Sequence, residues 1–176
     1  DGTEHTKQTR VTDLTRLSNG RLSAWCVTAT TMLGFLYKAE DPACCVLMTV
    51  CVDVVRVYVW TDDHGRKLKC SAPLYFDYAM SYIQELLTDE DVFPTKAGSV
   101  FPTGFVFLVQ KVFLLFFRTL AHIYGSHYRE TLALGLHPHL NTLFTHLTLF
   151  CRQHALLEPE DTEPLQDLIT ALGRQG

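Results

Sequence analysis

The chain has 176 residues, of which 47% are hydrophobic and 19% are charged. This length and this ordinary globular composition favour one domain with a buried core. Its net charge of −4 argues against a nucleic-acid-binding protein, because such proteins usually carry a basic face. The sequence shows no signal peptide, low-complexity tract or internal repeat.

The N-terminal part of the chain is predicted to form an arm followed by a helix. Residues 1–20 are polar and end in a turn signal, so we expect an extended arm ahead of a single domain at 21–176. Residues 22–37 carry apolar side chains at helical spacing, although β-branched residues weaken this helix prediction. A loop is expected at 38–43.

A β-hairpin and then a helix are predicted in the next segment. Residues 46–60 are rich in valine and alternate along their second half, which favours a strand. The turn DDHG at 62–65 and the following RKLKC complete a hairpin that closes at Cys70. Ser71 is expected to cap a helix with Pro73 in its first turn. The apolar stripe of this helix comprises Tyr75, Tyr78, Ala79, Tyr82, Ile83 and Leu86.

The most apolar run of the sequence is FVFLVQKVFLLFFRTLAHIYGSHY at 105–128. Apolar residues cover almost every side of its helical period, so a helix here would be buried all round. Thr103 is positioned to cap its start. A membrane span is the competing interpretation, but it needs about 18 nearly uninterrupted apolar residues. Because Gln110, Lys111 and Arg118 divide the run, a core helix is predicted and no transmembrane segment is expected.

Further helices are predicted in the C-terminal third. Residues 128–136 continue helically, and a long amphipathic helix starts at about Pro138. Its buried stripe comprises Leu140, Leu143, Phe144, Leu147, Phe150, Cys151 and His154. The run EPED at 158–161 ends this helix, and a short final helix covers about 163–172. The fold is therefore predicted to be mainly α, a helical bundle with one hairpin attached.

Two histidines stand at the end of the central helix, His122 and His127. On an unbroken helix their five-residue separation rotates them by about 140°, so they would not share a face. Gly125 lies between them and can end or distort the helix, which would let both rings point to one place. The spacing then suits a two-histidine metal clamp. The alternative is a partly buried histidine and an unrelated surface one.

Six cysteines are present, at positions 26, 44, 45, 51, 70 and 151. Cys26 and Cys151 lie in apolar or helical patterns and are predicted to be buried thiols. Cys44, Cys45 and Cys51 cluster, and together with the histidine pair they indicate a zinc site. Two Cys and two His complete a tetrahedral shell, which is typical of a structural zinc.

An enzyme would need a nucleophile, a base and a partner group, or a metal with an open coordination position. The sequence has no G-x-S-x-G, no glycine-rich phosphate loop and no H-E-x-x-H motif. Acidic residues at 88–91 and 158–163 are predicted to be solvated helix-end charges. A zinc-dependent hydrolase is therefore kept only as an alternative, and no catalytic residue is predicted.

Several stretches together resemble the Mob/phocein family of kinase co-activators. They are CSAPLYFDYAMSYIQELLTDEDVFPTK at 70–96, FPTGF at 101–105, RTLAHIYGSHY at 118–128 and HLNTLFTHLTLFCRQHALLEPEDTEPLQDLI at 139–169, with WTDDHGRKLKC at 60–70 matching the family's hairpin. The segments TDEDVFPTK, EHTKQTRVTD and ETLALGLHPHLNTL are similar to the branch that pairs with NDR-type kinases. Residues 14–60 match only in outline.

This resemblance implies a Mob-type helical domain with a four-helix core and one β-hairpin. Family members are non-enzymatic adaptors that bind the N-terminal regulatory segment of NDR/LATS-type serine/threonine kinases and promote, or compete for, their activation. The resemblance also implies a cytoplasmic and nuclear location. A phocein-like scaffold in a phosphatase complex is the alternative within the family.

The resemblance further implies a structural zinc held by two Cys and two His. His122 and His127 match the family's histidine pair. The family has C-x4-C, and Cys44 falls at its first position whereas Thr49 falls at its second. Cys51 is the nearest replacement, because adjacent cysteines could serve together only with local strain. The expected ligands are Cys44, Cys51, His122 and His127.

The family's kinase-contacting positions are occupied here by Trp25, Phe35, Leu36, Leu134 and His146. For the first three, ordinary core packing is the alternative role. The family's acidic residues around the tryptophan are replaced by Gly20, Arg21 and Ala24, which should lower the association rate with a basic kinase segment.

Some relatives bind phosphopeptides through a basic patch on the central helix. Arg118 matches the last member of that patch, but Leu114 and Leu115 replace the two upstream cations. One arginine cannot replace a cluster against a doubly charged phosphate. Phosphopeptide binding through Arg118 is therefore not expected.

Overall fold

A computed structural model of the chain describes residues 57–62, 64–94 and 100–174. Within them the chain forms a hairpin and a series of helices, as expected from the sequence. The elements are β1 (Tyr58–Thr61), β2 (Lys67–Cys70), α4 (Ala72–Thr88), α5 (Phe105–Ser126), α6 (Tyr128–Ala133), α7 (His137–His154), α8 (Pro159–Thr162), the 3-10 turn η2 (Glu163–Leu165) and α9 (Gln166–Gly173). The predicted arm at 1–20 and the predicted helix at 22–37 lie outside the described residues.

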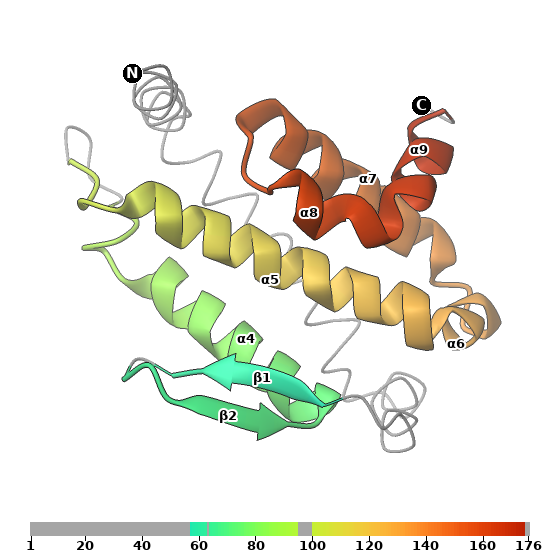
Figure 1. Cartoon of the computed structure of the whole chain (residues 1–176). Coiled ribbons are helices and arrows are strands. Elements are labelled where there is room, and N and C mark those ends of the chain that lie inside the picture. Colours follow the sequence, from blue (N-terminus) through green and yellow to red (C-terminus); the bar gives the residue numbers. More distant parts are fainter. Residues whose placement is uncertain (1–56, 63, 95–99, 175–176) are drawn as a thin grey trace.

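The central helix α5 crosses the middle of the molecule, with α4 and the hairpin on one side and α7, α8 and α9 on the other (Figure 1). It packs directly against both α4 and α7, while β1 packs on α4 and α9 packs on α7. The mainly α prediction with one attached hairpin is confirmed.

The core consists of the apolar faces that these helices turn toward one another. Val109, Val112, Phe113 and Phe116 of α5 are each at most 1% exposed. They meet side chains of the neighbouring helices that are equally buried, namely Phe76, Ala79 and Ile83 of α4 and Leu140, Phe144 and Leu147 of α7. By length and composition α5 could cross a membrane, but 56% of its most apolar window is buried inside the protein. Its apolar character is thus that of a core helix.

The hairpin has one packed side and one exposed side. In the antiparallel register Tyr58 faces Cys70 and Trp60 faces Leu68. Tyr58 and Trp60 pack on the helical core, whereas Val59 on the other side is 49% exposed. The bulky aromatic residues therefore mark the inward side of β1, and the valine marks the outward side.

Two sequence-based expectations about helix ends are wrong, and a third is confirmed in position. Thr103 does not cap α5, because its N-cap is Gly104 in the left-handed conformation with φ 88°. Gly125 does not end α5, which continues to Ser126. Ser71 does stand at the N-cap of α4, but its side chain makes no capping hydrogen bond.

The C-terminal helices also differ in detail from the prediction. Residues 128–136 form α6 and then a turn, in which Gly135 has a φ of 67°. The predicted final helix at 163–172 is preceded by the short helix α8, and it begins with the 3-10 turn before α9. Prolines in the first turns of α8 and of this 3-10 turn explain the interruption, since neither can donate a backbone hydrogen bond.

Candidate metal centre

His122 and His127 meet where α5 ends. His122 lies in the last turns of α5, and His127 leaves the helix with φ −132° and ψ 18°. This change of backbone direction cancels the rotation expected on a continuous helix, and the two Nε2 atoms lie 3.2 Å apart. Both rings are buried, with 5% and 2% of their surfaces exposed. The structure therefore brings the predicted pair together by ending the helix at His127 rather than at Gly125.

The second nitrogen of His122 is engaged by the hairpin. Its Nδ1 lies 2.9 Å from the hydroxyl oxygen of Tyr58 on β1. The Tyr58 ring meets the imidazole edge-on, with centroids 5.7 Å apart, and Phe76 of α4 packs on it at 5.0 Å. Tyr58 was not predicted as part of the site, although its large aromatic side chain in a valine-rich strand was a usable signal for a packed position.

Burial favours the neutral ring of His127. Burial lowers the pKa of His127 from its ordinary value, and the nearby charge of Glu130 opposes this shift only in part. With Nε2 facing Nε2, one nitrogen must donate a hydrogen atom and the other must accept it. Neutral imidazole is also the form that binds metals.

The geometry fits two ligands of one zinc ion. Two nitrogens that bind a tetrahedral zinc at about 2.0–2.1 Å lie about 3.3–3.4 Å apart. The observed separation of 3.2 Å is close to that value, and it also suits a direct hydrogen bond between the rings. Within the described residues no third His, Cys, Asp or Glu joins the pair.

The predicted cysteine ligands Cys44 and Cys51, and the neighbouring Cys45, lie outside the described residues. The sequence does place Cys51 within reach, because it precedes Tyr58 by seven residues. An extended chain of that length spans up to about 25 Å. Cys151 is buried as predicted, in α7.

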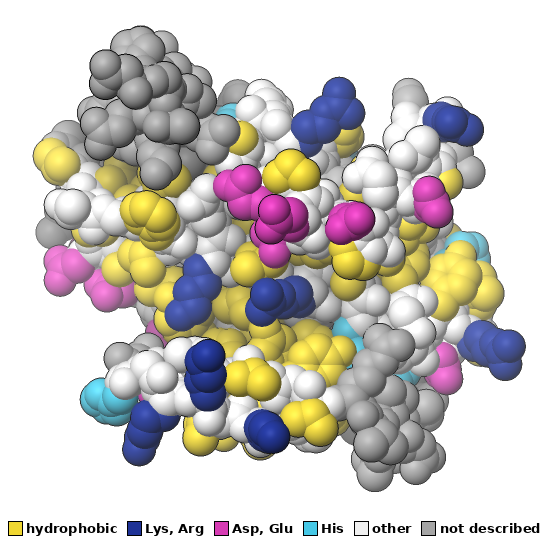
Figure 2. All heavy atoms as spheres, in the orientation of Figure 1, with side chains coloured by type: hydrophobic (Ala, Val, Ile, Leu, Met, Phe, Trp, Pro, Cys, Tyr) yellow, Lys and Arg dark blue, Asp and Glu magenta, His cyan; other side chains and the backbone are white. Residues whose placement is uncertain are grey.

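A cleft of about 570 Å³ opens beside His122 between β1, α5 and η2. Arg118 of α5 lines it and donates a hydrogen bond to the Tyr75 hydroxyl at 3.2 Å. Leu115, which replaces one of the family's cations, is buried in the core. Helix α5 contains no arginine besides Arg118, so it presents no arginine cluster to this cleft. Lys and Arg side chains gather over the hairpin and α5, whereas Asp and Glu gather over α8 (Figure 2).

The predicted kinase-contacting residues are only partly described. His146 is exposed on α7, and Leu134 is half-buried at the end of α6. Trp25, Phe35 and Leu36 lie outside the described residues.

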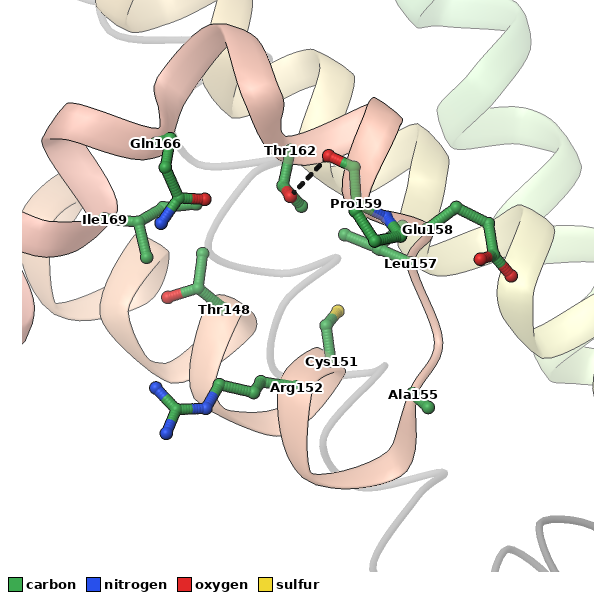
Figure 3. Close-up of a pocket in the computed structure, with 10 residues that line it drawn as sticks. All are labelled: Thr148, Cys151, Arg152, Ala155, Leu157, Glu158, Pro159, Thr162, Gln166 and Ile169. Carbon is green, nitrogen blue, oxygen red and sulfur yellow. Dashed lines mark hydrogen bonds between the residues drawn. The ribbon is translucent and has the colours of Figure 1, made fainter. Parts of the chain in front are cut away.

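A second cavity, of about 470 Å³, lies between the end of α7 and the segment from α8 to α9 (Figure 3). It forms where Ala155, with φ 48°, turns the chain after α7. Cys151, Arg152 and Ile169 are among its lining residues, and neither histidine of the pair lines it. None of the predicted site residues therefore contributes to this cavity.

Comparison with known proteins agrees with this mainly α fold. A sequence model of the Mob1/phocein family matches residues 22–165. This chain belongs to the Mob1/phocein family. Human MOB kinase activator 2 is 51% identical to it over 128 residues, which are 73% of this chain and 53% of that protein.

More distant relatives extend the similarity to insects and fungi. MOB kinase activator-like 2 of Drosophila melanogaster is 43% identical over 66% of this chain and 21% of its own length. Maintenance of ploidy protein mob2 of Schizosaccharomyces pombe is 41% identical over 68% of this chain and 49% of its own length. The alignment thus spans about half the length of the human and yeast relatives, and less of the insect protein.

Proposed function

We propose that this chain is a non-catalytic regulator that binds the N-terminal regulatory segment of an NDR/LATS-type serine/threonine kinase. The observation that carries the proposal is the 51% identity to human MOB kinase activator 2 over 73% of the chain. The segments TDEDVFPTK and ETLALGLHPHLNTL, which resemble the branch that pairs with NDR-type kinases, support it. The proposed sites of action are the cytoplasm and the nucleus.

The described part of the proposed kinase surface is the exposed side of α7. His146 and Leu149 are three residues apart on this helix and therefore lie near each other on its surface. Leu149 is 55% exposed, so it offers apolar area beside a group that can donate or accept a hydrogen bond. Leu134, half-buried at the end of α6, is proposed to extend this surface, together with Trp25, Phe35 and Leu36.

We also propose a structural zinc held by His122 and His127 with Cys44 and Cys51. The 3.2 Å separation of the two Nε2 atoms and the neutral state that burial favours for His127 support the histidine half. When bound, the ion would supply folding free energy and no catalysis, because four protein ligands leave no open position. It would fasten the segment that precedes the hairpin to the end of α5.

The proposal can be tested by calorimetry with the whole chain and the N-terminal segment of an NDR-type kinase. We expect a dissociation constant in the micromolar range or below. His146→Ala should weaken binding about tenfold if this residue is a binding hot spot. Gln84→Ala is the control, since it removes an exposed side chain from α4 instead of α7.

Absence of binding by the folded chain would overturn the kinase proposal. A phosphatase subunit used as a second bait distinguishes a phocein-like scaffold, which would bind that subunit instead. Zinc content, read by mass spectrometry on the same sample, tests the metal proposal separately, because a kinase-binding chain without zinc would contradict only the second proposal.

A further inference from the structure

We infer that Tyr58 is a positioning residue of the proposed zinc site, which it serves by holding the ring of His122 through Nδ1. This inference rests on the proposed zinc, because the ring is held for a metal at Nε2. It assigns a role to a residue of the hairpin, whereas the two histidines lie at the end of α5. The evidence is the 2.9 Å contact between the Tyr58 hydroxyl oxygen and His122 Nδ1.

The hydroxyl of Tyr58 is fixed from both ends of its side chain. Its backbone is paired with Cys70 in the hairpin, and the Cys70 thiol donates to the Tyr58 carbonyl oxygen at 3.7 Å. Its ring packs on Tyr75 and Phe76 of α4, with centroids 5.0 and 5.5 Å away. Since neither the backbone nor the ring can move without losing these contacts, the oxygen has a defined place against the imidazole.

The ring of His122 turns Nδ1 toward Tyr58 and Nε2 toward His127, and the Tyr58 oxygen can accept a hydrogen bond from Nδ1–H. When Nδ1–H donates to the Tyr58 oxygen, Nε2 carries the lone pair and points at His127. A metal that binds Nε2 needs this tautomer. Metal-bound histidines usually donate their second N–H to such a partner, which fixes the ring and makes the ligand more basic.

The same contact joins the hairpin to the end of α5. On this side β1 also makes ring contacts with α4, such as those of Tyr58 with Tyr75 and of Trp60 with Tyr82. Zinc affinity should therefore depend on Tyr58.

The test compares Tyr58→Phe with Tyr75→Phe in the whole chain. Both changes remove one hydroxyl and keep the ring, and the two rings are in contact. Tyr75 donates nothing to the histidines, and its oxygen accepts a hydrogen bond from Arg118 instead. Zinc affinity is measured by competition with a chromophoric chelator, with Zn²⁺ as the only ligand. We expect Tyr58→Phe to raise the dissociation constant about 10- to 100-fold and Tyr75→Phe to leave it unchanged.

Each other outcome overturns the inference in a recognisable way. Equal affinity in the wild type and Tyr58→Phe would remove the role of Tyr58 and leave the zinc proposal intact. Equal losses in both variants would mean that the aromatic cluster, and not this hydroxyl, sets the affinity. A folded wild type that binds no zinc would overturn both this inference and the zinc proposal.

A second measurement does not depend on the folding of any variant. Long-range proton–nitrogen NMR spectra of the zinc-loaded wild type report which nitrogen of His122 carries hydrogen. We expect a protonated Nδ1 and a metal-bound Nε2. The opposite assignment would overturn the inference, because the nitrogen beside the Tyr58 hydroxyl would then be the metal ligand and could not hydrogen-bond to it.

Discussion

The two ends of α5 are buried by different means. Its N-terminal two-thirds are buried by hydrocarbon, with Val109, Phe113 and Phe116 almost fully enclosed. The buried polar side chains of the described residues all lie at or beyond its other end, and they are Thr119, His122, His127 and Thr131. One helix therefore combines an apolar core with a polar cluster.

The difference shows how each part depends on the rest of the chain. An apolar side chain is stabilised by any well-packed neighbour, so the first part of α5 depends on volume and periodicity. A buried imidazole needs a particular partner in a particular place, because an unsatisfied polar group in the interior is costly. His122 finds one partner five residues away and another, Tyr58, on the hairpin.

The largest effect is expected in the apolar part. Phe113→Ala should lower the free energy of unfolding by about 3–5 kcal/mol, because it leaves a cavity between α5 and its neighbours. Phe107→Ala is the matched control on the same helix, since Phe107 is 70% exposed. Its change should stay within about 0.5 kcal/mol. Urea denaturation of both variants measures the contrast, and similar losses would contradict the exposed position of Phe107.

A smaller loss is expected in the polar part. His122→Ala should lower the metal-free stability by about 1–3 kcal/mol, because it removes a hydrogen-bond partner from both His127 and Tyr58. The control is His146→Ala, which removes an exposed histidine from α7. If zinc is bound, a strong chelator should lower the melting temperature of the wild type and leave that of His122→Ala unchanged. A chelator effect of equal size in both proteins would contradict the proposed ligand.

Sequence periodicity was sufficient for the first part of α5 and insufficient for the second. The helices, the hairpin and the core stripe of α7 follow from spacing alone, because burial of one face repeats with the helical or strand period. The sequence allowed the proposal that the two histidines lie close together. It did not show where the chain turns to bring them together, since this depends on the backbone conformation of His127. The bond to Tyr58 could not be foreseen, because it joins residues 64 positions apart.

The start of α5 offers a test of its backbone. Gly104→Ala should lower the free energy of unfolding by about 1–2 kcal/mol, because a Cβ atom is disfavoured in the left-handed conformation. Gly104 has φ 88°, and an added Cβ would meet no atom within 4 Å, so backbone strain alone sets the cost. Thermal or urea unfolding measures it. Unchanged stability would mean that the loop can rearrange, for example by letting Thr103 cap the helix.

The smallest effect, and one of opposite sign, is expected at the other glycine of this helix. Gly125 lies inside α5 and is not among the described glycines with positive φ. Gly125→Ala should therefore raise the free energy of unfolding by up to about 1 kcal/mol, since alanine loses less backbone freedom in a helix. It should also leave zinc affinity unchanged, because the turn that brings the rings together is made at His127. A loss of stability in urea denaturation would show instead that the cleft beside the hairpin needs a residue without a side chain, and that the polar end of α5 is fitted as closely as its core.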